Sequence, residues 1–360
     1  MADHRQSRQA SLRDIAASHG LDAVLIQHLP NIRYLTGFTG SAGLLLVTPH
    51  EVVLISDFRY AVQATQESGT VARVEIDRVS VWDRLRRIMA DLALETLGYE
   101  SHVATMRDLE RLVGTRARLV PGSDLVERLR AVKAPEEIAA IRSAAALAEE
   151  ALKAALPRIR PGQTEFEIAA SLEFELRRRG SEWHPFPTIV ASGPRSALPH
   201  ARTSERVVRP GDWLLLDFGA IVSGYCADLT RTYVVGAAAD ARQRATYDIV
   251  RAAQERSVQQ MRAGMPGRQV DALARELISE RGFGDAFGHS LGHGLGLEVH
   301  EAPRLSALAE EPLPEHAVVT VEPGIYFPGW GGVRLEEDVH LHLDGAELLS
   351  SGPTELIELR

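Results

Sequence analysis

The second part of this 360-residue chain repeats itself, and this repetition constrains the fold more than any other feature. The segments IRPGQTEFEIAASLEFELRRRG (159–180) and MRAGMPGRQVDALARELISERG (261–282) carry an arginine, a glycine and a final glycine at matching places. Each helical segment is followed by a loop that ends in a histidine, His200 in the first half and His300 in the second. Each loop is followed by a pair of strand-like stretches that carry two acidic residues. We therefore expect an internal duplication whose two halves are related by a pseudo-two-fold axis and converge on one cleft.

The acidic residues of these stretches are Asp217 and Asp228 in the first half and Glu322 and Glu336 in the second. Apolar runs precede three of them, which favours burial, and buried carboxylates need partners. A turn-like Ser-Gly pair separates Asp217 from Asp228, so a hairpin would make these two side chains face each other. For one such pair alone, exposed loop acids are an equally good interpretation. Opposed buried carboxylates, in contrast, require a compensating cation.

A histidine enclosed by glycines adds a nitrogen ligand to this set. His293 lies in a Gly-His-Gly triplet between His289 and His300, and the flanking glycines leave room for ions and substrate to approach. Any single histidine is also explained as a hydrogen-bonded core residue. Four carboxylates and one imidazole nevertheless form a hard, mostly anionic ligand set, which suits a pair of ions such as Mn²⁺, Co²⁺ or Zn²⁺. Two such ions about 3.5–4 Å apart commonly share a hydroxide and drive hydrolysis.

Composition excludes several other classes of function. The formal charge of −9 argues against a broad surface for nucleic acid or anionic membranes. No apolar run is long enough to span a membrane, and the polar start lacks the apolar core of a signal peptide. The lone Cys226 has no partner for an intramolecular disulfide and is interpreted as a packing residue. We therefore expect a cytoplasmic protein.

The first part of the chain carries no comparable cluster of ligands. Its patterns predict a helix over 8–19, a buried strand over 23–26 and a hairpin over 44–56. These alternating elements indicate an accessory α/β domain. We place it at residues 1–124, followed by a catalytic domain at residues 125–360.

Both domains resemble a known family. The stretches LLLDFG, GHGLGLEVHE, VVTVEPGIY and GVRLEEDV are similar to the ligand motifs of the M24 "pita-bread" metallopeptidases, which include methionine aminopeptidase, aminopeptidase P and prolidase. NIRYLTGFTGSAG (31–43) and DFRYAVQA (57–64) resemble the creatinase-like N-terminal domain of the branch that cleaves Xaa-Pro bonds. The implied fold class is α/β (α+β), with a creatinase-like N-terminal domain before a pseudo-two-fold pita-bread domain.

The resemblance implies a site and an activity. It implies two divalent metal ions per subunit, Mn²⁺ in the first place and Co²⁺ or Zn²⁺ as alternatives. The implied metal ligands are Asp217, Asp228, His293, Glu322 and Glu336. The implied catalytic residues are His200, His289, His300 and Glu322. The implied enzyme is an Xaa-Pro aminopeptidase, which releases the residue before proline from proline-containing peptides, and a homodimer is expected. In LEEDV, Glu337 stands where the family usually has aspartate.

Three alternative functions remain. An Xaa-Pro dipeptidase (prolidase) would use the same ligands, and the sequence does not separate it from an aminopeptidase. A metal-free hydrolase of the creatinase type, acting on a non-peptide amidine, is opposed by the complete ligand set. A non-catalytic pita-bread binding module is opposed by the same observation, since degenerate ligands would be its mark.

A few residues outside the ligand set have two interpretations each. Trp183, His184 and Phe186 either shape a proline pocket or pack their own loop. Arg304 either pairs with the carboxylate of a dipeptide or anchors its loop. Arg231 either holds a carboxylate near the metals or caps a strand in solvent.

Overall fold

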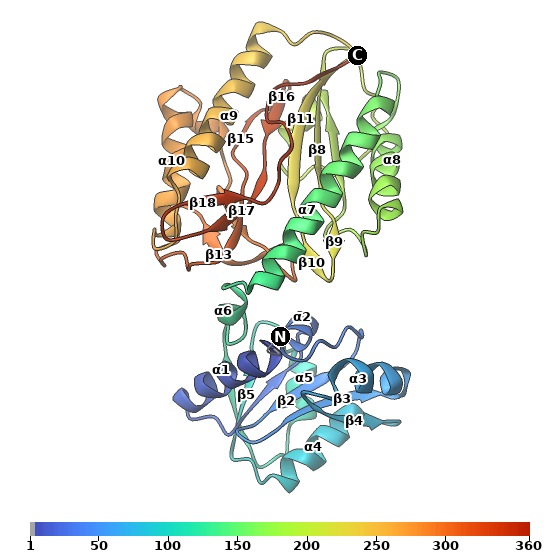
Figure 1. Ribbon diagram of the computed structural model, residues 1–360, viewed down its shortest axis with the longest axis vertical. Coiled ribbons are helices and arrows are strands. Elements are labelled where there is room, and N and C mark those ends of the chain that lie inside the picture. The colour runs from blue at the N-terminus through green and yellow to red at the C-terminus, as the bar shows by residue number, and fades with distance from the viewer. Residues whose placement is uncertain (1–3) are drawn as a thin grey trace. The chain divides into compact units, whose positions relative to one another are not determined.

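The computed structural model describes residues 4–360, and the chain divides into two units, Met1–Arg130 and Ala131–Arg360. Each unit has its own layers of helices and strands (Figure 1). Among the described residues, no helix has the length and apolar character needed to cross a membrane. The domain limits inferred from the sequence, 1–124 and 125–360, stay a prediction.

The first unit is built on a six-stranded mixed sheet with the order β4-β3-β2-β1-β5-β6. The predicted hairpin is present, because β2 and β3 pair antiparallel, and β1 covers the predicted buried strand. Strands β1 and β2 also pair antiparallel, and the three remaining pairs of neighbouring strands are parallel. The strands are β1 (Ala23–Ile26), β2 (Leu44–Val47), β3 (Val52–Asp57), β4 (Arg73–Asp77), β5 (Thr96–Glu100) and β6 (Arg118–Gly122).

Helices cover this sheet. The helix predicted over 8–19 spans His4–Ser18 in the structure. It begins earlier than predicted because the polar residues before its apolar face are also helical. In α4, the Ser80 hydroxyl caps the helix by accepting the N–H of Asp83, and buried Leu85 and Ile88 face the core of the unit. The helices are α1 (His4–Ser18), α2 (Leu29–Thr36), α3 (Ala61–Ser68), α4 (Val81–Asp91), α5 (Met106–Arg111) and α6 (Glu127–Arg130).

The second unit contains four long helices, two larger sheets and two two-stranded sheets. One larger sheet has the order β19-β11-β8-β7, and the other has the order β13-β12-β14-β17-β18. The helices are α7 (Pro135–Ala155), α8 (Glu165–Arg178), α9 (Ala241–Gln260) and α10 (Gly267–Glu280). The strands are β7 (Ile189–Ser192), β8 (Asp212–Phe218), β9 (Ile221–Val222), β10 (Tyr225–Cys226), β11 (Leu229–Val235), β12 (Gly292–Gly294), β13 (Glu301–Leu305), β14 (Val318–Val321), β15 (Gly324–Phe327), β16 (Gly331–Arg334), β17 (Glu337–Leu341), β18 (Ala346–Leu348) and β19 (Glu358–Leu359). Short 3₁₀ turns η1 (Phe58–Tyr60), η2 (Leu156–Arg158), η3 (Gly193–Ala197) and η4 (Gly284–Ala286) complete the chain.

The two halves of this unit repeat the same arrangement. In the first half α8 leads to β7, which pairs antiparallel with β8, and β8 pairs antiparallel with β11. In the second half α10 leads to β12, which pairs antiparallel with β14, and β14 pairs antiparallel with β17. Helices α7 and α8 flank the strands on one side and α9 and α10 on the other (Figure 1). A single bridge between Thr230 and Glu336 joins the two sheets, so the acidic stretches of both halves meet there.

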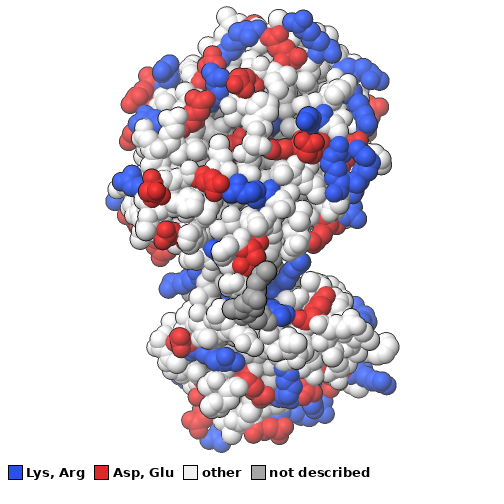
Figure 2. All heavy atoms as spheres, in the orientation of Figure 1, with Lys and Arg blue, Asp and Glu red and all other residues white. Residues whose placement is uncertain are grey.

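Charged side chains of both signs are mixed over the surface. Figure 2 shows acidic and basic residues interspersed on the face that it presents. Such mixing gives no large field of a single sign on this face.

Candidate metal centre

A cavity of about 840 Å³ lies within the second unit. Its lining comes from both halves of the duplication. All eight residues that the sequence analysis assigned to the site line it: His200, Asp217, Asp228, His289, His293, His300, Glu322 and Glu336. The structure therefore brings every predicted site residue to one place.

The ends of the paired strands position the four acids. Asp217 lies in β8, and Asp228 immediately precedes β11. Glu322 immediately follows β14, and Glu336 immediately precedes β17. The expectation that Asp217 and Asp228 oppose each other in the hairpin is wrong in detail, because the register pairs Asp217 with Thr230. Asp228 lies two residues before Thr230, nearer the turn, and both carboxylates still line the cavity.

The glycines beside His293 have a different reason from the one inferred. A Cβ atom on Gly292 would lie 2.0 Å from the carbonyl oxygen of Thr320, and one on Gly294 would lie 2.2 Å from that of Ala302. Side chains at these positions would clash with the backbone of neighbouring strands. The glycines therefore allow β12 to enter the sheet, which holds the His293 ring at the cavity.

The distances around His293 suit a shared cation. Its Nε2 atom lies 3.5 Å from Glu322 Oε1 and 3.8 Å from Asp228 Oδ2. Ligand atoms of Asp228, His293 and Glu336 all lie within 4.8 Å of one another. Nitrogen and oxygen ligands bind divalent ions at about 2.0–2.2 Å, so two ligands of one ion lie about 3–4 Å apart.

Buried carboxylate oxygens without a hydrogen-bond donor also indicate a cation in this cavity. Among residues 4–360, Asp217 Oδ1 and Asp228 Oδ1 are buried oxygens without a hydrogen-bond donor. A buried carboxylate oxygen without a partner is costly, and a cation removes that cost. The donor set is thus four carboxylates and one imidazole, which fits hard or borderline divalent ions such as Mn²⁺, Co²⁺ and Zn²⁺.

Burial shifts the pKa values of the whole cluster. Desolvation raises the pKa of Glu322 to about 8, and desolvation followed by mutual repulsion raises the pKa values of Asp228 and Glu336 well above their ordinary range. The pKa of Asp217 also rises through burial, although the nearby Arg334 guanidinium opposes the rise. Desolvation lowers the pKa of His293 to about 3, which keeps the imidazole neutral and able to bind a metal.

The remaining histidines line the cavity around the cluster. The ring centroid of His300 lies 4.3 Å from that of His293 in an edge-to-face arrangement. His289 Nδ1 lies 2.8 Å from the carbonyl oxygen of Ser290, and its Nε2 lies 2.9 Å from the Tyr326 hydroxyl. Burial lowers the pKa of His289 to about 4 and keeps that ring neutral, although the hydrogen bond with the Ser290 carbonyl opposes the shift. His200 enters from the loop before β8.

Comparison with known families decides the identity of this unit. A family model described as "Metallopeptidase family M24" matches residues 139–342. The chain belongs to metallopeptidase family M24. A second model, described as "Creatinase/Prolidase N-terminal domain", matches residues 8–132. The predicted fold class, a creatinase-like N-terminal domain followed by a pita-bread domain, is confirmed, and membership of the M24 family implies divalent metal ions.

Individual M24 proteins resemble this chain over nearly its whole length. An uncharacterized peptidase of Bacillus subtilis, YqhT, is 40% identical over 358 residues, which is 97% of this chain and 99% of that protein. The structure of a Bacillus anthracis protein titled Xaa-Pro dipeptidase is 40% identical, with a TM-score of 0.96 over 99% of this chain and 100% of its own. The structure of an X-Pro aminopeptidase from Thermotoga maritima is also 40% identical, with a TM-score of 0.90 over 97% and 99% of the two chains.

The sequence analysis missed a buried arginine in this M24 centre. Arg334 donates from Nη2 to Asp217, from Nε to Thr230 Oγ1 at 3.2 Å and from Nη1 to the Tyr326 hydroxyl at 3.0 Å. The Thr230 hydroxyl in turn donates to Glu336 Oε2 at 2.6 Å. Arg334 therefore links acids of both halves and supplies positive charge beside them. Its only signal was its place in GVRLEEDV, two residues before Glu336.

A second missed residue supports Asp228. The Asp338 carboxylate is fully buried, and its Oδ2 accepts the backbone N–H of Asp228 at 3.1 Å. This bond ties the beginning of β11 to β17. It fixes the position of one predicted ligand from the opposite half of the unit.

The interpretations left open for other residues are now resolved in part. Of the WHPFP stretch, Phe186 lines the cavity, whereas Trp183 is 61% exposed and neither it nor His184 lines the cavity. Arg304 also lines the cavity, from β13. Cys226 is buried and its pKa is raised by desolvation, as fits a packing residue.

Arg231 lies inside the unit and does not cap a strand in solvent. Its Nη2 is 2.7 Å from Glu337 Oε1, and its Nη1 donates to the backbone carbonyl of Glu336 at 2.7 Å. Both side chains of the pair are almost completely buried. Arg231 thus holds the backbone of Glu336, a predicted ligand, and neutralises the carboxylate of Glu337, which stands where the family usually has aspartate.

Replacing Arg231 with leucine is expected to lower the free energy of unfolding by about 3–5 kcal/mol, because the buried Glu337 carboxylate loses its partner. Urea denaturation of the two proteins measures the change. Arg116→Leu is the matched control, since that exposed arginine pairs with Glu95 at the surface and contributes at most about 1 kcal/mol. An Arg231 variant as stable as the control would contradict the buried-pair interpretation.

The raised carboxyl pKa values predict that the metal-free protein loses stability as pH rises. Between pH 4.5 and about 8 the folded protein holds a proton on Glu322 that the unfolded chain has released. Each such proton lowers the free energy of unfolding by up to about 1.4 kcal/mol per pH unit. The lowered pKa values of His289 and His293 act in the opposite sense, but only below 6.5. Between pH 6.5 and 8, the change in the free energy of unfolding therefore reports the titration of the buried carboxyl groups.

Denaturation of chelator-treated protein at both ends of this interval measures the effect. We expect lower stability at the higher pH, and we expect added Mn²⁺ to reverse the loss because cations stabilise the ionised carboxylates. Equal free energies of unfolding at the two pH values without metal would show that the acids do not share one buried site.

Proposed function

We propose that this M24 protein is a metal-dependent peptidase that hydrolyses Xaa-Pro bonds and releases the residue preceding proline, as an Xaa-Pro aminopeptidase does. The observation that carries the proposal is the convergence of four acids, three of them buried, and His293 in one cavity. The substrate class is supported by similar proteins from Bacillus anthracis and Thermotoga maritima, whose titles name Xaa-Pro or X-Pro substrates.

We assign two divalent ions to the centre, Mn²⁺ in the first place, with Co²⁺ and Zn²⁺ as alternatives. The proposed ligands are Asp217, Asp228, His293, Glu322 and Glu336. Two ions bound there would supply a hydroxide near neutral pH and polarise the scissile carbonyl. The number of carboxylates supports two ions, because four negative charges exceed what one divalent ion neutralises.

The protein's own groups complete the chemistry. Glu322, as an ionised carboxylate beside the bound cations, accepts the proton of the attacking water and delivers it to the departing proline nitrogen. This delivery is needed because the proline nitrogen takes the electron pair of the broken C–N bond and would otherwise leave as an amide anion. His200 and His300 donate hydrogen bonds to the carbonyl oxygen as it becomes an oxyanion. His289, held by the Tyr326 hydroxyl, lines the same cavity and supports it.

A second candidate function, Xaa-Pro dipeptidase, is favoured by one observation. Arg304 lines the cavity, and a guanidinium there can pair with the free carboxylate of a dipeptide. The two similar structures named above are equally identical to this chain, at 40%, and their titles name different activities. Sequence identity therefore does not choose between the two functions.

A cleavage assay over peptides of graded length tests the proposal. Metal-free protein is supplied with Mn²⁺ and given Xaa-Pro dipeptides, Xaa-Pro-Yaa tripeptides and longer Xaa-Pro peptides. We expect metal-dependent release of the first residue from the tripeptides and longer peptides. Turnover of dipeptides alone would establish the dipeptidase, and no metal-dependent cleavage of either would refute the class. A homodimer, a cytoplasmic location and the domain limits 1–124 and 125–360 are proposed from the sequence and the resemblance alone.

A further inference from the structure

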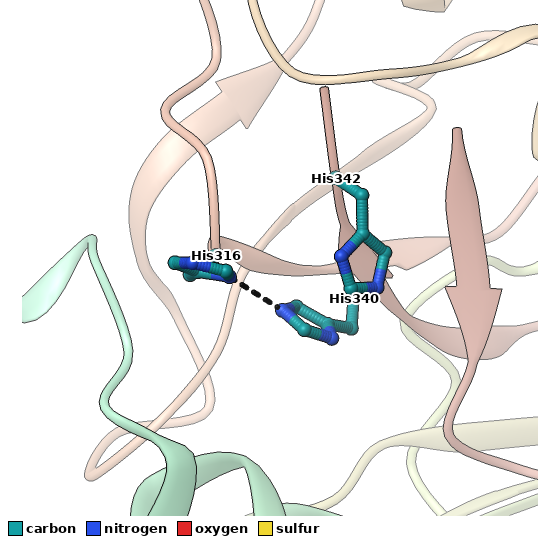
Figure 3. Close-up of side chains that lie close together, drawn as sticks. All are labelled: His316, His340 and His342. Atoms are coloured by element: carbon teal, nitrogen blue, oxygen red, sulfur yellow. Dashed lines mark hydrogen bonds between the residues drawn. The ribbon is translucent and has the colours of Figure 1, made fainter. Parts of the chain in front are cut away.

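Three histidines gather in the second unit away from the cavity of the metal centre. His316 lies in the turn before β14, His340 lies in β17, and His342 follows that strand. Figure 3 shows the three imidazoles together, with a dashed line between His316 and His340. One nitrogen of each ring lies within 4.8 Å of a nitrogen of the other two. None of the three lines the cavity of the metal centre.

The nitrogen spacing fits a tetrahedral ion. His316 Nδ1 lies 3.2 Å from His340 Nε2. Two imidazole nitrogens bound at about 2.0–2.1 Å to one tetrahedral Zn²⁺ lie about 3.4 Å apart. We propose that His316, His340 and His342 bind one Zn²⁺-like transition-metal ion, with water in the fourth position, at a site separate from the peptidase centre.

The Glu347 carboxylate lies beside His340 Nδ1, where it could accept the proton of a metal-bound imidazole. Glu347 Oε2 lies 3.6 Å from His340 Nδ1, which is too long for a hydrogen bond, and this buried nitrogen has no hydrogen-bond partner within residues 4–360. When Nε2 of a histidine binds an ion, its Nδ1 carries the proton and usually donates it to a carboxylate. Glu347 is held in place for this role, because Arg142 Nη2 lies 2.8 Å from its Oε1.

The backbone fixes the three ligands before any ion arrives. The N–H of His316 donates to the carbonyl of Leu341 at 2.9 Å, and the N–H of His342 donates to that of Gly345 at 2.8 Å. His316 has a φ of 64°, a left-handed conformation that non-glycine residues rarely adopt. Such a conformation at a residue whose side chain completes a cluster is typical of functional positions. The His316 side chain is exposed, so an ion can enter from solvent.

Nearby positive charges do not oppose an ion at this site. The Lys133 ammonium lies 2.7 Å from Glu301 Oε1, and the Arg142 guanidinium is paired with Glu347. A plain hydrogen bond would account for His316 and His340 alone. It would leave unexplained why the His342 ring lies with its centroid 4.1 Å from that of His340.

Zinc binding to the whole protein tests the site. The variant carries His316→Asn and His342→Asn, because asparagine tolerates the left-handed backbone at position 316 and both changes spare the buried His340. Metal-free wild type and variant are titrated with Zn²⁺ by calorimetry, and their zinc content is measured after loading. We expect the variant to bind one Zn²⁺ fewer per chain, or to bind that ion at least about 100-fold more weakly. We expect its Mn²⁺-dependent peptidase activity to equal that of the wild type.

Two controls separate this site from the peptidase centre. His293→Ala is expected to lose zinc from the centre and to keep the ion bound by the three histidines. Circular dichroism establishes that the His316/His342 variant is folded. Identical titrations and identical zinc content for wild type and the folded variant would overturn the proposal, whatever the peptidase assay shows.

Discussion

Replacing His293 with alanine will abolish metal-dependent hydrolysis of Xaa-Pro peptides. The residue supplies the only imidazole among the proposed ligands, and its Nε2 lies 3.5 Å from Glu322 Oε1 and 3.8 Å from Asp228 Oδ2. Mutation of a residue that only supports a metal ligand typically lowers metal affinity or activity by about 10–100-fold. We therefore expect loss of a ligand itself to lower activity by more than about 100-fold. The measurement is kcat/KM at fixed Mn²⁺, together with the affinity for Mn²⁺.

The matched control for this change is His50→Ala. His50 is an exposed residue in the turn between β2 and β3, and its loss will leave activity unchanged. If the protein were a non-catalytic binding module, His293→Ala would leave its function intact. Retention of wild-type hydrolysis by a folded His293→Ala protein would therefore remove this residue from the centre.

Replacing Glu322 with glutamine will lower kcat by about 10²–10⁴-fold, the usual contribution of a positioned proton-transfer group. Glutamine keeps the shape and one oxygen ligand, but it does not accept the proton of the attacking water. We expect KM to change little, because substrate contacts outside the reacting bond are preserved. Steady-state kinetics with saturating Mn²⁺ measure both quantities.

Two comparisons guard this result. Glu310→Gln removes an exposed carboxylate that pairs with Arg268, and it will leave kcat unchanged. Metal content must be measured on the same samples. Recovery of full activity by the Glu322→Gln protein at higher Mn²⁺ would contradict the proton-transfer role, since it would reduce Glu322 to a ligand.

Local patterns in the sequence predicted the residues that meet in the cavity. Asp217 and Glu322 each follow an apolar run that becomes a buried strand, β8 and β14, so their place at the cavity could be inferred from neighbouring residues. The duplication predicted that the two halves converge, and the bridge between Thr230 and Glu336 is where they do. Residues whose environment is set by adjacent residues are the ones that a sequence reveals.

Residues whose partners are distant in the chain escaped prediction. Arg334 acts through Asp217 and Thr230, more than a hundred residues earlier, and only the register of β8, β11 and β16 brings them together. His316 and His340 meet because β14 pairs with β17. The glycines around His293 were noticed, but their reason, close approach to backbone carbonyls, required the neighbouring strands.

Anomalous diffraction from crystals of the protein grown with Mn²⁺ tests the central claim most directly. We predict two manganese peaks in the second unit, enclosed by Asp217, Asp228, His293, Glu322 and Glu336. No peak among these five side chains, in crystals whose solution contains the ion, would contradict the assignment of a metal centre to this cavity.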